Sequence, residues 1–266
     1  MYDKITKIMG ILNVTPDSFS DGGAFAEPDE AVAHAIEMQA EGADFIDVGA
    51  ESTRPGFTPL TEEEEWSRLK GILPLLSKSI SVPISVDTYK AKTAELALNN
   101  GAKVINDIWG GLADPEMFRV LAGSGAAYIL MHNSTETPLL GKDVVQEVRQ
   151  QLQNRVESAL HAGMSERQII LDPGVGFGKT QAQNLELINR IDEMRIDPFP
   201  ILLGPSRKSV IGHVLGLPVS ERLEGTAAIV AVAIMRGTDI LRVHDVRSMV
   251  RVAKMTDALI SSSVVL

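Results

Sequence analysis

Eight short apolar runs in this 266-residue chain are each followed by polar or charged residues. Carboxylates and amides can pair with the edge of a planar ligand, and basic side chains can hold a phosphate. Any one of these residues could equally cap a helix or order a turn. In chain order they are Asn13, Glu51-Ser52-Thr53-Arg54, Asp87-Thr88, Asn106-Asp107, His132-Asn133, Asp172, Ser206-Arg207-Lys208 and Arg242-Val243-His244-Asp245. We expect a phosphate-bearing ligand to meet Arg54, Lys208 and Arg242, with His244 beside them.

A glycine-rich segment, Pro173–Thr180, ends in Gly-Lys-Thr, as a nucleotide-binding P-loop does. The spacing does not fit, because Pro173 stands where a P-loop needs its first glycine. The glycines at 174, 176 and 178 also miss the dinucleotide-binding pattern. The segment is therefore expected to be a tightly turning or mobile loop.

The histidines show no spacing that would place two of them together on one element as zinc ligands. They are His34, His132, His161, His213 and His244. Mg²⁺ needs no such set, because it commonly binds through one or two protein oxygens, substrate phosphates and water. His34 and His161 are expected within helices, as surface or packing residues.

The apolar runs are typical of strands that are buried on both faces of a parallel sheet. Most precede a stretch with helical periodicity, such as the apolar stripe from Val145 to Ala159. This alternation predicts an α/β fold, a (β/α)8 TIM barrel forming a single domain over residues 1–266, with a doubly wound open sheet as the alternative. A barrel gathers its active site at the carboxyl ends of the strands. The runs are Ile8–Leu12, Phe45–Gly49, Ile84–Asp87, Val104–Asn106, Tyr128–Met131, Ile169–Asp172, Ile201–Gly204 and Ile240–Val243.

The composition excludes several classes of protein. With 44% hydrophobic and 23% charged residues, the chain can bury a large core and is not disordered. The longest apolar run, Ala227–Met235, is too short to cross a membrane, and we see no signal peptide at the N-terminus. A net charge of −10 opposes binding to nucleic acid or to an anionic membrane. The absence of cysteine excludes disulfides and thiolate chemistry and favours the cytoplasm.

Several segments resemble the signature motifs of dihydropteroate synthase, an enzyme family of folate biosynthesis. The resemblance covers essentially the whole chain in order. One departure is His132-Asn133, where the family often has His-Met. The matching segments are Met9–Gly23, Asp47–Gly56, Ser85–Thr88, Ile105–Asp107, Leu171–Lys179, Ser206–Ser209 and Arg242–Asp245.

The resemblance implies small-molecule substrates: 4-aminobenzoate and 6-hydroxymethyl-7,8-dihydropterin pyrophosphate, condensed to 7,8-dihydropteroate and pyrophosphate with Mg²⁺. It places Asp172, Asn106, Asp87, Lys208 and Arg242 around the pterin. It also implies that Thr53, Arg54, Arg242 and His244 surround the pyrophosphate, that Asn13 binds Mg²⁺, and that Ser18, Phe19, Pro55, Phe177 and Ser206 shape the aminobenzoate pocket. The residues expected to take part in catalysis are Arg54, Lys208, Arg242 and His244.

The family forms homodimers and is the target of sulfonamides. In this chain the apolar segment Thr226–Met235 could serve as the interface or could simply pack on the barrel. Two other functions stay open from the residues alone. A pterin-binding methyltransferase barrel would share the pterin-facing Asn and Asp, and a catalytically silent pterin-binding paralogue would share the fold.

Overall fold

The computed structural model describes residues 5–15, 27–51, 58–134 and 143–262. Within these ranges eight parallel strands form one sheet in the order β6-β5-β4-β3-β2-β1-β8-β7. The sheet closes where Leu171 of β6 bridges to Ile201 beside β7, and the Leu171 amide donates to the Pro200 carbonyl at 2.9 Å. The strands are β1 (Lys7–Asn13), β2 (Phe45–Gly49), β3 (Ile84–Asp87), β4 (Val104–Asp107), β5 (Ala127–Met131), β6 (Ile169–Asp172), β7 (Leu202–Leu203) and β8 (Ile240–Val243).

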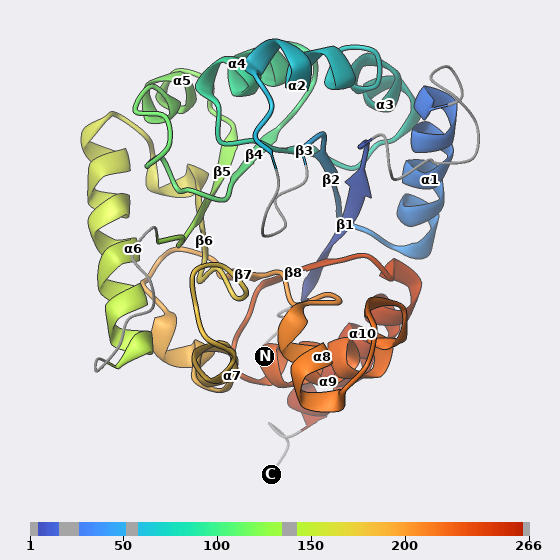
Figure 1. The fold of residues 1–266 in the computed structure, drawn as a ribbon, viewed down its shortest axis with the longest axis vertical. Helices are drawn as coiled ribbons and strands as arrows, with labels where there is room; N and C mark the ends of the chain where they lie inside the picture. The colour runs from blue at the N-terminus through green and yellow to red at the C-terminus, as the bar shows by residue number, and fades with distance from the viewer. Residues whose placement is uncertain (1–4, 16–26, 52–57, 135–142, 263–266) are drawn as a thin grey trace.

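Helices surround the strands and cover the outside of the sheet (Figure 1). Some of them begin at a side-chain cap: the Asp143 carboxylate accepts from the Val145 amide at 2.9 Å before α6, and Thr180 and Gln183 form a capping box before α7. The helices are α1 (Glu27–Glu41), α2 (Glu62–Leu69), α3 (Leu73–Ser79), α4 (Ala91–Asn99), α5 (Met117–Ala122), α6 (Val144–His161), α7 (Gln181–Asn189), α8 (Ser209–Leu215), α9 (Leu223–Met235) and α10 (Val246–Ser262).

The predicted (β/α)8 barrel is confirmed, and the open-sheet alternative is wrong because β6 and β7 meet. The eight apolar runs coincide with the eight strands, but β7 is shorter than the predicted Ile201–Gly204, since Ile201 makes only the single bridge. His34 lies in α1 and His161 ends α6, as expected. Among the described residues, no helix has both the length and the apolar character needed to span a bilayer.

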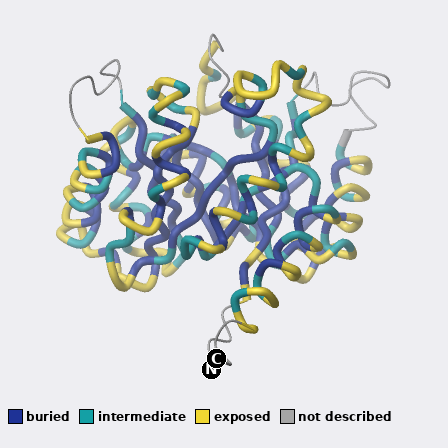
Figure 2. Tube along the Cα trace, turned by 90° about the horizontal axis from the view of Figure 1, so that it is seen from below, coloured by how far each residue is buried: buried dark blue, intermediate teal, exposed yellow. Residues whose placement is uncertain are grey.

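Two apolar clusters make up the core. The larger one fills the space between the strands and the helices, and Figure 2 shows these buried segments inside an exposed outer surface. The smaller one contains buried side chains from six strands: Met9, Val104, Ile129, Ile170, Leu202 and Ile240. Because strand side chains alternate between two faces, the residue two positions later on each strand has the same orientation. Asn106 therefore has the same orientation as Val104, Asp172 the same as Ile170, and Arg242 the same as Ile240. These three polar side chains lie above the smaller cluster.

Candidate active site

A network of buried polar groups lies at the carboxyl ends of β2, β3, β4 and β8. Arg242 Nε donates to Asp47 Oδ2 at 2.6 Å, and Arg242 Nη2 donates to Asp87 Oδ2 at 2.9 Å. Asn106 Nδ2 also donates to Asp47 Oδ2, at 3.1 Å. Burial raises the pKa of Asp87 to about 7, an effect that Arg242 opposes and Asp47 reinforces. The structure therefore brings together Asp87, Asn106 and Arg242, as the sequence predicts.

Asp47 is the residue that the sequence analysis missed. Its side chain is completely buried, and its Oδ1 has no hydrogen-bond partner among the described residues. Asp47 Oδ2 accepts from Asn106 Nδ2, so the Asn106 amide is oriented with its nitrogen toward β2 and its oxygen free to accept from a ligand. Asp47 was overlooked because it lies inside a strand, two residues before the strand ends. Its position two residues after the inward Phe45 was the available signal.

Asp172 and Lys208 form the other side of the site. Asp172 Oδ1 accepts from the Gly174 amide at 2.7 Å, and burial raises the pKa of the carboxyl, while the charge of Lys208 opposes the shift. Lys208 Nζ donates to the Val175 carbonyl and lies 4.5 Å from the centre of the Phe177 ring. Burial lowers the pKa of Lys208 to about 8. The predicted residues Asp172, Phe177 and Lys208 are thus neighbours.

The glycine-rich loop between β6 and α7 has a packing role. Gly174, Gly176 and Gly178 all have positive φ. A Cβ at Gly174 would lie 1.9 Å from the His132 carbonyl oxygen, and one at Gly176 would lie 2.9 Å from Lys208 Cδ. The glycines let the loop fold tightly against the end of β5 and against Lys208. The expectation of a tightly turning loop is confirmed.

Ser206 and His244 contact each other at the ends of β7 and β8. His244 Nδ1 lies 3.0 Å from Ser206 Oγ, and the His244 amide donates to the same oxygen at 3.2 Å. Between Ser206 and Lys208, Arg207 has a φ of 58° and makes two hydrogen bonds to Asp245, at 2.6 and 3.1 Å. A left-handed arginine is strained, and the paired carboxylate holds it in place. This turn fixes the positions of Ser206 and Lys208.

Three of the polar residues that follow strands have structural roles. Glu51 accepts from Lys90 Nζ at 2.5 Å and from the Tyr89 hydroxyl at 2.7 Å. Thr88 Oγ1 donates to Glu65, which the same lysine approaches at 3.3 Å. Asp107 accepts from the amides of Trp109 and Gly111 and from the Tyr128 hydroxyl. These side chains order the loops that follow β2, β3 and β4. They therefore have the turn-ordering role that any polar residue after a strand can have.

Asn13 ends β1 beside Gly49 and Asp87 in the strand register. A Cβ at Gly49 would lie 3.6 Å from Asn13 Oδ1 and 4.0 Å from Asp87 Oδ2, so the glycine leaves room next to both oxygens. Oxygen donors of this kind suit Mg²⁺. Within the described ranges, no three His, Asp or Glu side chains gather into a metal cage.

Five predicted site residues lie outside the described residues. They are Ser18, Phe19, Thr53, Arg54 and Pro55. The first two belong to the segment after β1, and the other three belong to the segment after β2. Their proposed roles stay predictions.

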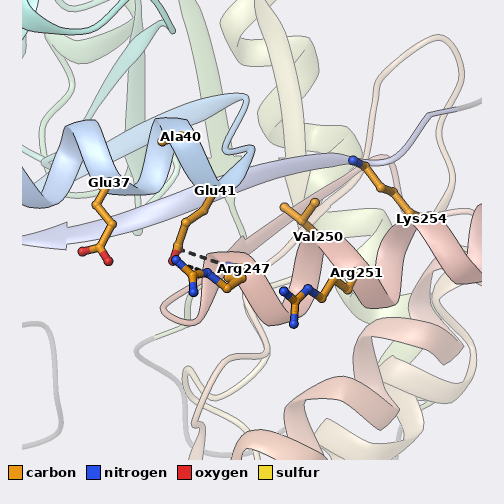
Figure 3. A pocket seen from close by; sticks show the side chains of 7 residues that line it. All are labelled: Glu37, Ala40, Glu41, Arg247, Val250, Arg251 and Lys254. Carbon is orange, nitrogen blue, oxygen red and sulfur yellow. Dashed lines mark hydrogen bonds and ion pairs between the residues drawn. The ribbon is translucent and has the colours of Figure 1, made fainter.

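A groove of about 320 Å³ lies elsewhere, between α1 and α10 (Figure 3). Glu41 and Arg247 form an ion pair across it at 3.0 Å. Glu41 is the last residue of α1 and leads into the amino end of β2, so the groove belongs to the outer helical layer. We do not include it in the site.

A (β/α)8 barrel with carboxylates, an amide and two cations at the carboxyl ends of its strands has the architecture of a barrel enzyme whose site takes a polar ligand. The family model of the pterin binding enzymes matches residues 9–244. The dihydropteroate synthase of Clostridium beijerinckii is 50% identical over 96% of this chain and 94% of its own length. The chain belongs to the dihydropteroate synthases of the pterin binding enzyme family.

Two solved structures have the same fold. The dihydropteroate synthase of Clostridium difficile, solved in the presence of pteroic acid, superposes with a TM-score of 0.93 at 46% identity, covering 97% of this chain and 99% of that one. The Xanthomonas albilineans enzyme, solved with 4-aminobenzoic acid, gives a TM-score of 0.91 at 39% identity, with coverage of 96% and 93%.

Proposed function

We propose that the site condenses 4-aminobenzoate with 6-hydroxymethyl-7,8-dihydropterin pyrophosphate, giving 7,8-dihydropteroate and pyrophosphate. The observation that carries this proposal is the set of acceptors formed by Asp172, Asn106 and Asp87 next to two cations, Lys208 and Arg242. A pterin presents a 2-amino group and ring N–H groups along one edge, and these donors match carboxylate and amide oxygens. The ligands of the two related structures, pteroic acid and 4-aminobenzoic acid, support the same substrates.

The orientation of each group supports pterin binding. The Gly174 amide donates to Asp172 Oδ1 and helps to fix the orientation of the carboxylate, which can still accept donors of the ligand. The Asn106 oxygen faces away from Asp47 and can accept as well. Lys208 supplies donors for the acceptor edge of the pterin, and Arg242 can lay its planar guanidinium over the ring.

The reaction needs no covalent intermediate. The amine nitrogen of 4-aminobenzoate forms a bond to the pterin methylene carbon as the carbon–oxygen bond to pyrophosphate breaks. The electron pair leaves with pyrophosphate, and the nitrogen loses one proton. Catalysis then consists of positioning the two substrates and stabilising the departing negative charge. We propose that Arg242, His244, Arg54 and Thr53 perform the second task.

We also propose that Mg²⁺ takes part, held by Asn13 and otherwise by the diphosphate of the substrate and by water. The ion would supply positive charge next to the leaving group. Because Asn13 is the one protein ligand that we propose, Mg²⁺ should bind weakly to the free enzyme and more tightly once inorganic pyrophosphate is present. Calorimetric titration of Mg²⁺ with and without pyrophosphate tests this expectation. Equally tight binding in both titrations would contradict it.

The test of the proposed function is direct. The protein is incubated with the pterin pyrophosphate, 4-aminobenzoate and Mg²⁺, and dihydropteroate is measured by chromatography. Product formation is expected, and its loss when either substrate is omitted is the control. Methyl transfer to or from a reduced pterin without condensation would favour the methyltransferase alternative. Binding of pterin with no turnover would favour the silent paralogue.

Two further expectations stay predictions. A homodimer is supported by the apolar residues that α9 leaves on the surface, among them Val232 and Met235, which are 40% and 69% exposed. The same helix also packs on the barrel through Val230, Ala233 and Ile234. The second expectation is a cytoplasmic location, which the cysteine-free sequence favours.

A further inference from the structure

Lys179 ends the glycine-rich loop, and its side chain turns back under that loop. Lys179 Nζ donates to the carbonyl oxygens of Gly174 and Phe177, both at 2.9 Å, and lies 3.0 Å from His132 Nδ1. Burial lowers the pKa of Lys179 to about 7, against the charge of Asp172; in its protonated form the amine has three N–H donors, and three close acceptors surround it. Thr180, the next residue, caps α7, so the backbone on the far side of Lys179 is fixed as well.

His132 is suited to be a permanent acceptor for Lys179. Its side chain is completely buried, and burial lowers its pKa to about 3, helped by the positive charges of Lys179 and Arg155. The ring is therefore neutral at physiological pH. Because Nδ1 accepts from Lys179, Nε2 carries the proton and donates to Gln151 Oε1 at 3.0 Å. Gln151 belongs to α6 and in turn donates to Glu147, so the ring is anchored to the outer helical layer.

The loop that Lys179 holds contacts both charged groups of one side of the site. The Gly174 amide donates to Asp172 Oδ1, which helps to fix the orientation of this carboxylate. The Val175 carbonyl accepts from Lys208 Nζ, and the Phe177 ring packs against the same ammonium. A shift of the loop would therefore move Asp172 and Lys208 together. In Figure 1 the loop runs from the end of β6 to α7, with β5 on the other side of β6.

We propose that Lys179 is a positioning residue for the pterin subsite, with His132 as its fixed acceptor. Lys179 touches no substrate in this scheme. It acts by holding Gly174–Phe177, and through that loop it sets the carboxylate of Asp172 and the ammonium of Lys208. The inference rests on the proposed function, because it takes these two residues to be the ones that meet the pterin. It also gives a role to His132, which had none in the sequence analysis.

The test compares ligand affinities in matched variants. Lys179→Met keeps the apolar stem and removes all three donors. Titration calorimetry with a pterin that lacks phosphate should show at least a tenfold loss of affinity, and kcat/KM should fall by a similar factor. The affinity for inorganic pyrophosphate should stay within twofold of wild type. Lys92→Met, on the exposed surface of α4, is the control and should leave all values unchanged.

Two variants of His132 test the contact between Lys179 and His132 by changing the acceptor. His132→Asn keeps an acceptor close to the position of Nδ1, and His132→Leu removes it. We expect the loss of pterin affinity to be small in the first variant and close to that of Lys179→Met in the second. If Lys179→Met does not fold, the His132 pair carries the comparison. In the double variant with Lys179→Met and Lys208→Met, the loss of pterin-binding free energy should be smaller than the sum of the losses in the two single variants.

A purely structural role makes a different prediction. The melting temperature of Lys179→Met would then fall, while pterin affinity and kcat/KM of the folded protein would equal those of wild type. That result would overturn the proposal. A wild-type protein that binds no pterin would instead overturn the proposed function, so the two failures can be told apart.

Discussion

Asp47 connects two groups that are expected to meet the substrate, and its carboxylate never has to touch the ligand itself. Asp47→Asn removes the charge that Arg242 Nε pairs with and lets the Asn106 amide turn over. Losing one charge-assisted bond costs about 1–3 kcal/mol, so we expect pterin affinity to fall by about tenfold. Calorimetry with the bare pterin measures the loss. Unchanged affinity would show that Arg242 and Asn106 are held by other contacts.

Asp172 gives the sharpest separation between pterin and phosphate recognition. Asp172→Asn keeps the shape but can place an amide donor opposite the donors of the pterin. The lost bond and the unpaired donor should each cost roughly 1–3 kcal/mol, which lowers the affinity for bare pterin by at least about tenfold. Pyrophosphate affinity should change little, because its expected contacts are Arg54, Arg242 and His244. A variant that binds pterin as wild type does would make Asp172 a turn residue only.

The lowered pKa of Lys208 predicts that pterin binding depends on pH. Burial lowers its pKa to about 8, and the carboxylate of Asp172 limits the fall. The side chain is therefore charged below that pH and loses its proton as the pH rises through about 8, so pterin affinity should weaken across this window. Lys208→Arg keeps the charge and should flatten the profile above pH 8. Titrations from pH 8 to 10 in both proteins, above the pKa of about 7 of the neighbouring Asp87, would decide this, and a wild-type curve that stays flat would contradict the prediction.

Arg242 is expected to contact both the pterin and the pyrophosphate. Arg242→Ala removes a charge expected near pyrophosphate and a surface expected to cover the pterin, so affinity for each should fall and turnover should drop. The change also leaves Asp47 and Asp87 without their cation, so some loss of stability is expected as well. Steady-state kinetics together with a thermal melt separate the two effects. Near-normal kcat/KM in the folded variant would remove Arg242 from the site.

The loop after β6 can be tested as an element. Gly174 has a φ of 68°, and a Cβ there would overlap the His132 carbonyl oxygen. Gly174→Ala should therefore destabilise the protein by about 2 kcal/mol or more and lower Tm by roughly 4 °C or more. Gly123→Ala, where φ is −83° and the added atom meets open space, is the matched control. Equal melting temperatures in the two variants would show that the loop can move away.

Sequence periodicity was sufficient to find the elements but not all of their contacts. A two-residue alternation along β4, β6 and β8 links core residues to Asn106, Asp172 and Arg242, so these side chains could be predicted. The partners of Arg207 could not, because its bonds to Asp245 join two loops that only the closed barrel brings together. The same holds for Lys179 and His132, which are 47 residues apart in the chain.

At the scale of the whole molecule, the barrel was predictable because eight mostly apolar runs alternate with longer stretches, most of which have helical periodicity. The oligomeric state does not follow from this pattern, because some apolar residues of α9 pack on the barrel and others are exposed. We expect a homodimer with twice the 28.7 kDa mass of the chain. Light scattering after gel filtration measures the mass, and Met235→Glu should shift it toward the monomer. A monomeric wild type would leave the exposed face of α9 without a partner copy.

The barrel has few hydrogen bonds between β6 and β7, which favours local opening there. A single bridge, between Leu171 and Ile201, joins β6 to the residue before β7, whereas β1 and β2 are paired over five positions. Amide hydrogen exchange should therefore be fastest along this seam, since few bonds must break to open it. Asp172 lies on one side of the seam and Lys208 on the other, so a ligand held by both would tie the edges together. Bound pterin should slow exchange at Leu171 far more than at the tightly paired Leu12.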